Sequence, residues 1–281
     1  MTTLMALHAH PDDESSKGAA TVARYADAGV RCVLVTATAG EAGDILNPAM
    51  DRPDVRENLA EYRRKELEDA ARIIGYADVV MLGYRDSGMP DSEDNANPAA
   101  FVNADYDEAL GKVVGLVRSY RPDVFLGYDS HEFYPHPDHL RVYALTMDIV
   151  AAAADPERFP DAGEPWLIKR LVASLFSRRG LLAIHDVLME RDGESPFTEW
   201  VERINVSDWP ERPTLSVHVL ETMQRARDAL RAHTTQVDPD GFWFKVPIEI
   251  AQEVYPYEDF EIISGVLPTA GGVGDLFDGI A

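Results

Sequence analysis

Hydrophobic and polar positions alternate along the chain in blocks that predict strands separated by helices. Near-continuous apolar runs predict buried strands at residues 3–9, 30–38, 78–84, 123–129 and 168–177. Apolar positions at helical spacing predict helices at residues 15–29, 54–75, 105–122 and 137–155. This repeated order indicates an α/β fold, with a Rossmann-like three-layer architecture and a mainly parallel sheet.

The pattern is less regular after about residue 180. Residues 214–236 predict a strand followed by a helix, whereas the remaining sequence is typical of loops, with a flexible tail at 265–275. We therefore expect an α/β core over residues 1–178. A smaller and looser α+β portion over residues 179–281 is expected to pack on that core.

The strongly acidic composition narrows the range of partners. The 281 residues include 49 acidic and 26 basic side chains, a net charge of −23, so the surface repels nucleic acids and anionic membranes. There is no long apolar run and no basic-then-apolar leader, and we expect a soluble cytoplasmic protein. Cys32 is the one cysteine, which excludes an internal disulfide, and its apolar neighbours predict a buried strand residue.

Two clusters of histidines and carboxylates follow predicted strands. The stretch "HAHPDDES" (8–15) follows the first strand, and "YPHPDH" (134–139) follows the fourth. Open parallel sheets place their sites at the carboxyl ends of strands, so the clusters are expected to meet in space. Four of the eight histidines fall in these turns, which favours a metal site over the alternative that Asp12, Asp13, Ser15 or Asp138 only cap helices.

The spacing within the clusters suits a catalytic metal. Catalytic zinc usually takes three protein ligands and leaves a fourth position for water. His10 and Asp13 can come from one turn because Pro11 bends the chain, and His139 can come from the other turn. We expect one zinc ion, although iron(II) would also suit a His–Asp–His site.

The remaining polar residues of the two clusters suit acid–base work. Asp12 would stand beside the bound water as a base, and His136 would face the substrate carbonyl. Asp138 would be available to orient an imidazole.

The pair of motifs "HAHPDDE" and "HPDH" resembles the PIG-L/LmbE-like zinc deacetylases. The resemblance implies the same zinc ligands and base as proposed above. It also implies that His136 stabilises the oxyanion, helped by Tyr134. His8 has no ligand role in that family and is expected to be a strand-end residue.

Longer stretches resemble the mycothiol S-conjugate amidases of actinobacteria: "ILNPAMDRPDV", "DSGMP", "RFPDAGEPW" and "DALRAHTTQVDP". The resemblance implies hydrolysis of the amide between glucosaminyl-inositol and the S-substituted cysteine of a small-molecule thiol conjugate. Such an enzyme would serve detoxification or an antibiotic pathway. The alternative is the related deacetylase of N-acetylglucosaminyl-inositol, which shares the zinc motifs; Lys17 and "FPDAGEPW" favour the amidase.

The same resemblance implies four substrate-binding positions: Lys17, Glu41, Arg63 and Asp86. Cations and carboxylates hydrogen-bond sugar hydroxyls well. Each position has a plainer alternative: an exposed lysine, a helix-surface salt bridge of Arg63 with Glu61 or Glu66, and turn caps for the two acids.

One segment departs from the resemblance, and two other protein classes are disfavoured. His131, Glu132 and Phe133 are expected to reshape the thiol-conjugate side of the pocket. A dinucleotide-binding protein would need a glycine fingerprint after the first strand, and "HAHPDDES" contains no glycine. A catalytically silent paralogue that docks a partner is disfavoured because every expected catalytic residue is present, and no oligomeric state is indicated.

Overall fold

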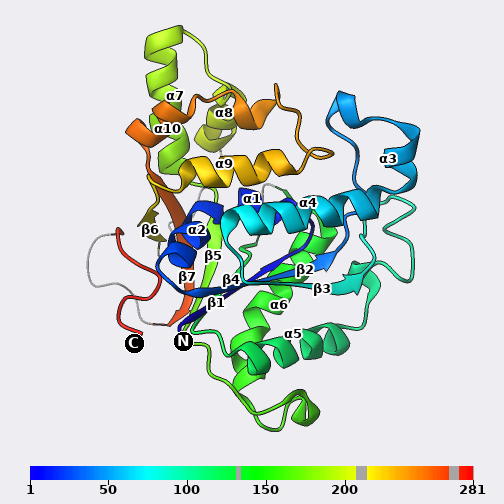
Figure 1. Ribbon diagram of the computed structural model, residues 1–281. Helices are drawn as coiled ribbons and strands as arrows, with labels where there is room; N and C mark the ends of the chain where they lie inside the picture. The colour runs from blue at the N-terminus through cyan, green and yellow to red at the C-terminus, as the bar shows by residue number, and fades with distance from the viewer. Residues whose placement is uncertain (131–133, 207–213, 266–271, 281) are drawn as a thin grey trace.

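The computed structural model describes residues 1–130, 134–206, 214–265 and 272–280 (Figure 1). Its strands are β1 (Thr3–His8), β2 (Arg31–Thr38), β3 (Asp78–Tyr84), β4 (Val124–Gly127), β5 (Arg170–Leu175), β6 (Thr214–His218) and β7 (Tyr257–Gly265). They form one sheet in the order β3-β2-β1-β4-β5-β7-β6. The first five strands are parallel to one another, and β7 is antiparallel to both β5 and β6. The predicted α/β fold with a mainly parallel sheet is confirmed.

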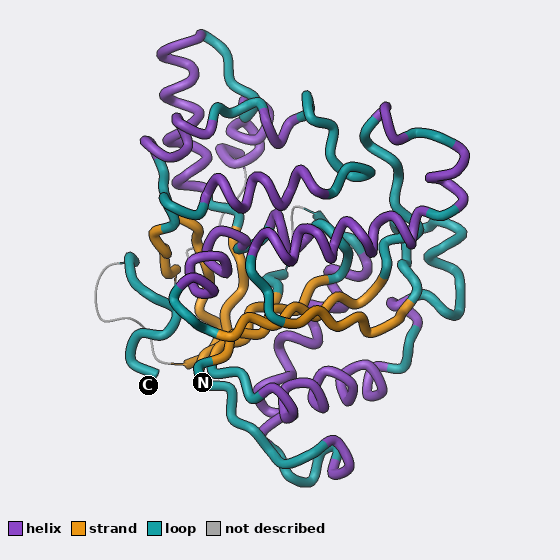
Figure 2. The backbone as a smooth tube through the Cα atoms, viewed as in Figure 1, coloured by secondary structure: helices purple, strands orange, loops and turns teal. Residues whose placement is uncertain are grey.

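Helices cover both faces of the sheet (Figures 1 and 2). One face carries α2 (Ala19–Asp27), α4 (Leu59–Ile74) and α9 (Met223–Ala232), and the other carries α5 (Tyr106–Tyr120) and α6 (Pro137–Ala154). Alternate residues of β1 enter the two cores, with Leu4 and Ala6 on the first face and Met5 and Leu7 on the second. A strand that is buried on both faces explains its continuous apolar sequence.

The helix predicted at residues 15–29 is two helices. The short α1 (Asp13–Ser16) is separated from α2 by Gly18, which adopts φ +87°. A Cβ atom on Gly18 would lie 3.2 Å from Leu126 and 3.3 Å from Phe260. The chain therefore changes direction at a residue that side chains of β4 and β7 approach closely, which helical periodicity alone does not reveal.

The helix predicted at residues 54–75 is also interrupted. The short α3 (Pro53–Glu57) is followed by Asn58, whose φ of −125° lies outside the helical range, and α4 begins at the next residue. Gly75, at φ +105°, ends α4 as a left-handed residue after the last turn.

The region after residue 180 contains more regular structure than the sequence predicted. It includes α7 (Arg178–Asp192), α8 (Thr198–Val206), α10 (Ile248–Val254) and β7. β7 lies between β5 and β6, so its place depends on pairing with strands distant in sequence. Short 3-10 helices occupy Pro48–Met50, Phe101–Asn103, Pro160–Ala162 and Phe242–Phe244. A boundary near residue 178 stays a prediction, since strands from both sides of it share one sheet.

The end of the chain was expected to be a flexible tail. Residues 266–271 lie outside the described part, and residues 272–280 pack against the sheet. Leu276 is fully buried, and Arg170 donates to the carbonyls of Leu276 and Asp278, each at 2.6 Å. This described part of the tail is therefore held by a buried arginine.

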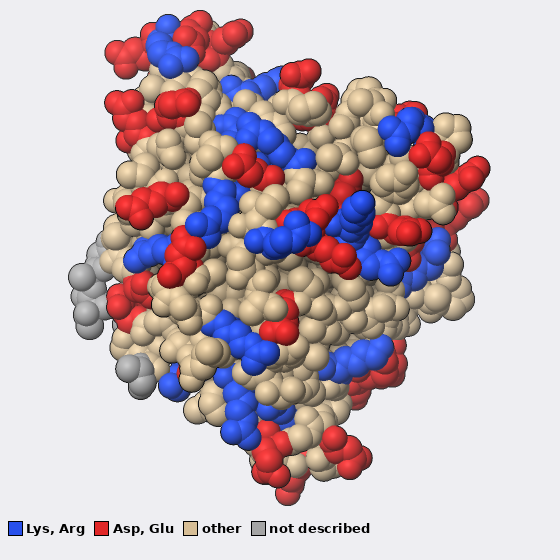
Figure 3. All heavy atoms as spheres, viewed as in Figure 1, with Lys and Arg blue, Asp and Glu red and all other residues tan. Residues whose placement is uncertain are grey.

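Three features of the composition can be compared with the structure. Cys32 is fully buried in β2, and burial raises the pKa of its thiol to about 12, as expected for a strand residue that is not a nucleophile. On the face drawn in Figure 3, acidic and basic side chains are intermixed. No helix within the described residues is long and apolar enough to cross a membrane.

Candidate active site

The first histidine–carboxylate turn lies at the carboxyl end of β1. Asp12 adopts φ +115°, a conformation that is uncommon for residues other than glycine. The backbone N–H of His10 donates to Oδ2 of Asp13 at 2.9 Å, which fixes the two residues relative to each other. Asp12 stands at the N-cap of α1, but its side chain makes no capping bond, so the capping alternative is wrong for this residue.

The second turn lies beside the first, because β4 and β1 are neighbours in the sheet. His139, in the first turn of α6, places its ring centroid 5.3 Å from that of His10. Its Nε2 is 3.4 Å from Asp13 Oδ2, and His10 Nδ1 is 3.6 Å from the same oxygen. All three side chains are buried.

These three side chains could hold a metal ion, since their ligand atoms all lie within 4.8 Å of one another. A tetrahedral ion with bonds of about 2.1 Å separates its ligand atoms by about 3.4 Å. The distances from Asp13 Oδ2 to His139 Nε2 and to His10 Nδ1, 3.4 and 3.6 Å, are close to that value. A second buried trio, His10, Asp86 and His136, meets the same 4.8 Å limit and shares His10 with the first.

Asp138 orients the ring of His10. Its Oδ2 lies 3.1 Å from His10 Nε2 and accepts the backbone N–H of Ser87 at 3.0 Å. Because a carboxylate accepts only, Nε2 of His10 carries a proton toward Asp138, and Nδ1 is the nitrogen that can offer a lone pair to a metal ion once its own proton is lost. Asp138 does not cap α6; the N-cap is His136, whose Nδ1 accepts the Asp138 N–H at 3.2 Å.

The electrostatics of this pocket favour a cation. Burial lowers the pKa of His139 to about 3, so its ring stays neutral and can offer a lone pair. Burial also disfavours charge on His10, yet bonds with Asp13, Asp138 and Asp86 raise its pKa well above the ordinary value. Burial opposes ionisation of Asp13, but Lys17 and the histidines hold its pKa well below the ordinary value. The buried carboxylates therefore draw positive charge into the pocket.

Asp12 is held by a buried arginine. Arg63 is 3% exposed and donates to Asp12 Oδ2 at 2.9 Å, to the carbonyl of Pro11 at 2.5 Å and to that of Gly40 at 2.6 Å. The surface salt bridge considered for Arg63 is therefore wrong. Burial raises the pKa of Asp12 above its ordinary value, against the opposing effect of Arg63.

His136 presents a hydrogen-bond donor to the pocket. Its Nδ1 accepts the Asp138 N–H, so in the neutral ring the proton lies on Nε2. Burial lowers the pKa of His136, which favours that neutral form. Within the described residues Nε2 has no hydrogen-bond partner, and the ring packs edge-on against His10 at 4.6 Å between centroids.

Two further predicted residues lie beside the trio. Tyr134 is 52% exposed, with its ring centroid 5.2 Å from that of His139 and 6.0 Å from that of His136. Lys17 Nζ lies 2.5 Å from Asp13 Oδ1, so it is not an ordinary exposed lysine.

The loops after β2 and β3 bring the two remaining predicted acids to the same region. Asp86 is buried, 3.5 Å from His10 Nε2, and also accepts the Gly88 N–H at 2.9 Å, so it caps a turn and faces the site. Glu41 lies between Gly40 and Ala42, which are tied to Arg63 and Asp86. Its Oε2 is buried and has no hydrogen-bond partner among the described residues.

Sequence reasoning missed a buried pair behind the first turn. Glu14 Oε1 lies 2.6 Å from His233 Nε2, and both side chains are fully buried. Burial disfavours charge on His233, but the Glu14 carboxylate raises its pKa. Glu66 binds the next residues, Thr234 and Thr235. In the sequence, "AHTTQ" contributes only to the resemblance, although a histidine and two threonines after a predicted helix are a usable signal.

Two other stretches named in the sequence do not line the described site. His131, Glu132 and Phe133 lie outside the described residues. The stretch "FPDAGEPW" packs at the amino end of the sheet, where Trp166 Nε1 donates to the carbonyl of Pro122 at 2.8 Å, just before β4.

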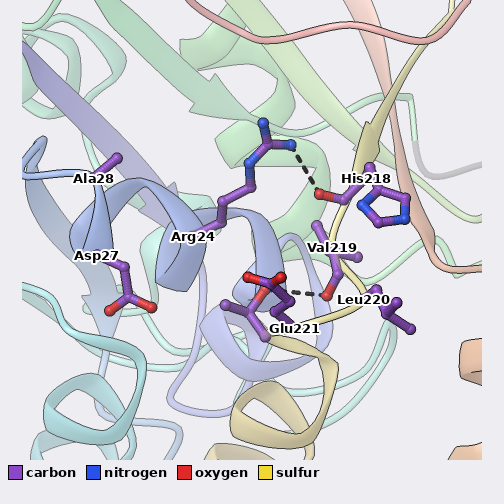
Figure 4. Close-up of a pocket in the computed structure, with 8 residues that line it drawn as sticks. Arg24, Asp27, Ala28, His218, Val219, Leu220 and Glu221 are labelled. Atoms are coloured by element: carbon purple, nitrogen blue, oxygen red, sulfur yellow. Dashed lines mark hydrogen bonds between the residues drawn. The ribbon is translucent and has the colours of Figure 1, made fainter.

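A separate hollow lies between α2 and the end of β6 (Figure 4). Its Arg24 donates to the carbonyl of His218 at 2.8 Å, and its Asp27 pairs with Arg225 at 2.7 Å. These charged groups are satisfied by their neighbours. Both trios that could hold a metal lie instead at the carboxyl end of the sheet, among the described residues.

Comparison with known sequences identifies the family. Residues 5–150 match the family described as PIG-L, GlcNAc-PI de-N-acetylase. The chain belongs to the PIG-L family. Among its relatives, the mycothiol S-conjugate amidase of Streptomyces coelicolor is 42% identical over 99% of this chain and 97% of its own length. The 1D-myo-inositol 2-acetamido-2-deoxy-alpha-D-glucopyranoside deacetylase of Thermobifida fusca is 38% identical over 98% of each chain.

Solved structures agree with this PIG-L assignment at the level of the fold. The N,N'-diacetylchitobiose deacetylase from Pyrococcus horikoshii has a TM-score of 0.63 at 21% identity, over 93% of this chain and 84% of its own. The 4-carboxy-2-hydroxymuconate hydratase GalB from Pseudomonas putida also reaches 0.63, at 14% identity, over 96% and 100%. The fold thus carries more than one chemistry. Family and sequence relatives make this PIG-L chain an amide-bond hydrolase, an amidase or deacetylase.

Proposed function

We propose that this protein is a zinc-dependent amidase that hydrolyses mycothiol S-conjugates. The observation that carries the chemistry is the buried trio of His10, Asp13 and His139 with Asp12 next to it in the chain. The choice of substrate is supported by the 42% identity to the S. coelicolor amidase, against 38% to the T. fusca deacetylase. The products would be glucosaminyl-inositol and an S-substituted N-acetylcysteine.

The trio suits zinc as the resident ion. It offers two imidazole nitrogens and one carboxylate oxygen, a common donor set for catalytic zinc, and His10 would release the proton of Nδ1 when the ion binds. Zinc at this position would polarise the amide carbonyl and lower the pKa of a water molecule. Asp138, bonded to His10, would keep the ligand tautomer fixed.

Asp12 is the proposed general base. Its pKa is raised by burial, which makes the carboxylate a better proton acceptor than an exposed aspartate. Arg63 holds one carboxylate oxygen, Oδ2, so the other is free to take the proton of the attacking water. The protonated Asp12 would then give the proton that it took from the water to the departing amine.

His136 is the proposed oxyanion stabiliser. Its neutral ring presents an Nε2–H that has no partner within the described residues, and such a donor suits developing negative charge on the amide oxygen. Tyr134, on the exposed side of His136 and His139, would add its hydroxyl as a second donor.

The polar groups around the trio are proposed to hold the sugar and the inositol. Glu41 Oε2, buried without a described partner, would accept a hydroxyl proton, and Asp86 would do the same beside His10. Lys17, whose Nζ is bonded to Asp13, would also contact the substrate. Arg63 would act mainly by holding Asp12, because its guanidinium is already bonded there.

A comparison of two substrates tests this proposal. The zinc-loaded enzyme is given a bimane-labelled mycothiol conjugate and, separately, N-acetylglucosaminyl-inositol, each with and without a chelator. We expect a higher, chelator-sensitive kcat/KM for the conjugate. Faster release of acetate from the acetylated sugar would assign the protein to the alternative deacetylase reaction, which uses the same site.

A further inference from the structure

We propose that His233 is a positioning residue: acting through Glu14, it fixes the backbone of Asp12 and so determines where the base stands. The inference rests on the proposed function, because the placement of Asp12 affects turnover only if Asp12 is the base. Neither His233 nor Glu14 belongs to the trio that could hold the metal.

Glu14 connects the other two residues through its two oxygens. Oε1 lies 2.6 Å from His233 Nε2, and Oε2 accepts the backbone N–H of Asp12 at 2.9 Å. Ser15 Oγ donates to Oε1 at 2.5 Å. Glu14 is fully buried, so both oxygens depend on protein partners for their hydrogen bonds.

Asp12 needs such support because its backbone is in an unusual conformation. A non-glycine residue at φ +115° is strained and persists only where its surroundings enforce it. Arg63 holds the Asp12 side chain and the Pro11 carbonyl, whereas Glu14 holds the Asp12 amide. The α1 helix has four residues, too few to fix the turn alone.

His233 holds Glu14 from a position that its own surroundings fix. Its imidazole is fully buried, Nδ1 has no partner among the described residues, and the bond to Glu14 is its one hydrogen bond there. The residues after it are fixed to α4, since Glu66 accepts bonds from Thr234 Oγ1 at 2.6 Å and Thr235 Oγ1 at 2.7 Å. His233, which follows α9, is thus tied through the Glu14 side chain to the turn that bears Asp12.

The first test is a set of kinetic measurements on zinc-loaded variants. His233→Leu removes the bond to Glu14, whereas His233→Gln keeps an amide donor near the place of Nε2. Because small displacements of a reacting group cost on the order of a hundredfold, we expect His233→Leu to lower kcat by about 10- to 100-fold. KM and zinc content should not change, and His233→Gln should recover most of the loss.

A matched control separates positioning from general loosening. Thr235→Val removes a bond between the same segment and Glu66 but leaves the Glu14–His233 contact in place. We expect kcat of Thr235→Val to stay within a few-fold of wild type. An equal loss of kcat in Thr235→Val and His233→Leu would overturn the proposal.

The second test does not depend on turnover. Amide hydrogen exchange is followed in peptides covering residues 10–16 of the zinc-loaded proteins. The Asp12 amide should exchange slowly in wild type and His233→Gln and faster in His233→Leu. Unchanged exchange in His233→Leu would contradict the proposal, and this readout stands even if the wild-type enzyme hydrolyses neither substrate.

A double variant covers the case in which His233→Leu does not fold. Glu14→Leu/His233→Leu replaces the pair with apolar side chains and leaves no buried charge unpaired. We expect this folded double variant to show the same loss of kcat and the same faster exchange at Asp12. Full activity with slow exchange in the double variant would overturn the proposed role.

Discussion

Buried arginines have different partners at the carboxyl edge of the sheet, where the parallel strands end, and at the amino edge, where they begin. At the carboxyl edge, Arg63 bonds to the side chain of Asp12, a charged group that stays partly exposed to the pocket. At the amino edge, Arg118 is buried and donates to six backbone carbonyls, those of Ala152, Ala153, Asp155, Arg158, Phe159 and Gly163. Arg170 likewise binds carbonyls of the last described segment.

The difference separates function from stability within one fold. The arginines of the amino edge satisfy backbone acceptors and thereby hold connecting segments against the core. The carboxyl edge instead retains groups without described partners, such as Glu41 Oε2 and His136 Nε2, which a substrate could engage. Changes at the carboxyl edge should therefore affect chemistry, and changes at the amino edge should affect stability.

The largest effect is expected from loss of a proposed metal ligand. His139→Ala should lose both zinc and detectable turnover, because two side chains no longer fix the ion in a catalytic geometry. Zinc content and amidase rate are measured on the purified variant. His218→Ala, at an exposed position of β6, serves as the control and should match wild type. Full zinc retention in His139→Ala would remove that residue from the ligand set.

Substitution of the proposed base should separate metal binding from turnover. Asp12→Asn is expected to keep zinc and to lower kcat by about 10²- to 10⁴-fold, the usual contribution of a positioned base. The amide keeps the size of the side chain and an oxygen that can still accept from Arg63. If Asp12→Asn instead lost its zinc, Asp12 would belong among the ligands.

Substitution of His136 should lower kcat without loss of bound zinc. His136→Ala removes the Nε2–H donor, and kcat should fall by about 10²- to 10³-fold, as for loss of one oxyanion donor. His136→Gln should restore part of the rate, because its amide supplies a donor. Loss of zinc in His136→Ala would favour the second trio, His10, Asp86 and His136, as the metal site.

Asp138 should have a smaller effect, on the affinity for the metal. Asp138→Asn weakens the bond that orients His10, and such partners typically contribute 10- to 100-fold, so zinc affinity should fall by about that factor. Zinc titration of the metal-free variant measures this fall in affinity. An unchanged zinc affinity would mean that the bond from His10 to Asp138 does not help His10 to bind the metal.

The smallest effect on activity is expected at the amino edge. Arg118→Met should leave kcat unchanged but lower the free energy of unfolding by about 2–4 kcal/mol, because several buried carbonyls lose their donor. Denaturant unfolding measures the loss, with Arg72→Met, an exposed position on α4, as the control. A large fall in kcat with unchanged stability would contradict the division between the two edges.

The parts of the fold that depend on local pattern could be predicted from the sequence. β1 to β5 and the helices α5 and α6 follow from apolar runs and helical spacing, and their observed ends differ from prediction by a few residues. β7 could not be placed, because its position between β5 and β6 depends on antiparallel pairing with distant strands. The break at Gly18 depends on the close approach of Phe260, which is equally remote in sequence.

The candidate site likewise contains residues that could be predicted from the sequence and residues that could not. His10, Asp13 and His139 could be proposed because two motifs follow strands that a parallel sheet brings to one edge. The Glu14–His233 pair could not, since its members are 219 positions apart and no local pattern reports their contact. Helical spacing likewise says which face of α4 bears Arg63, but not that its long side chain reaches Asp12.

The central claim is that one metal ion is held by His10, Asp13 and His139. The most direct test is anomalous diffraction at the zinc edge from crystals of the zinc-loaded protein. We predict a single peak at about 2.0–2.2 Å from one atom of each of these three side chains. A sole peak between His10, Asp86 and His136, or no peak at either trio, would contradict the account.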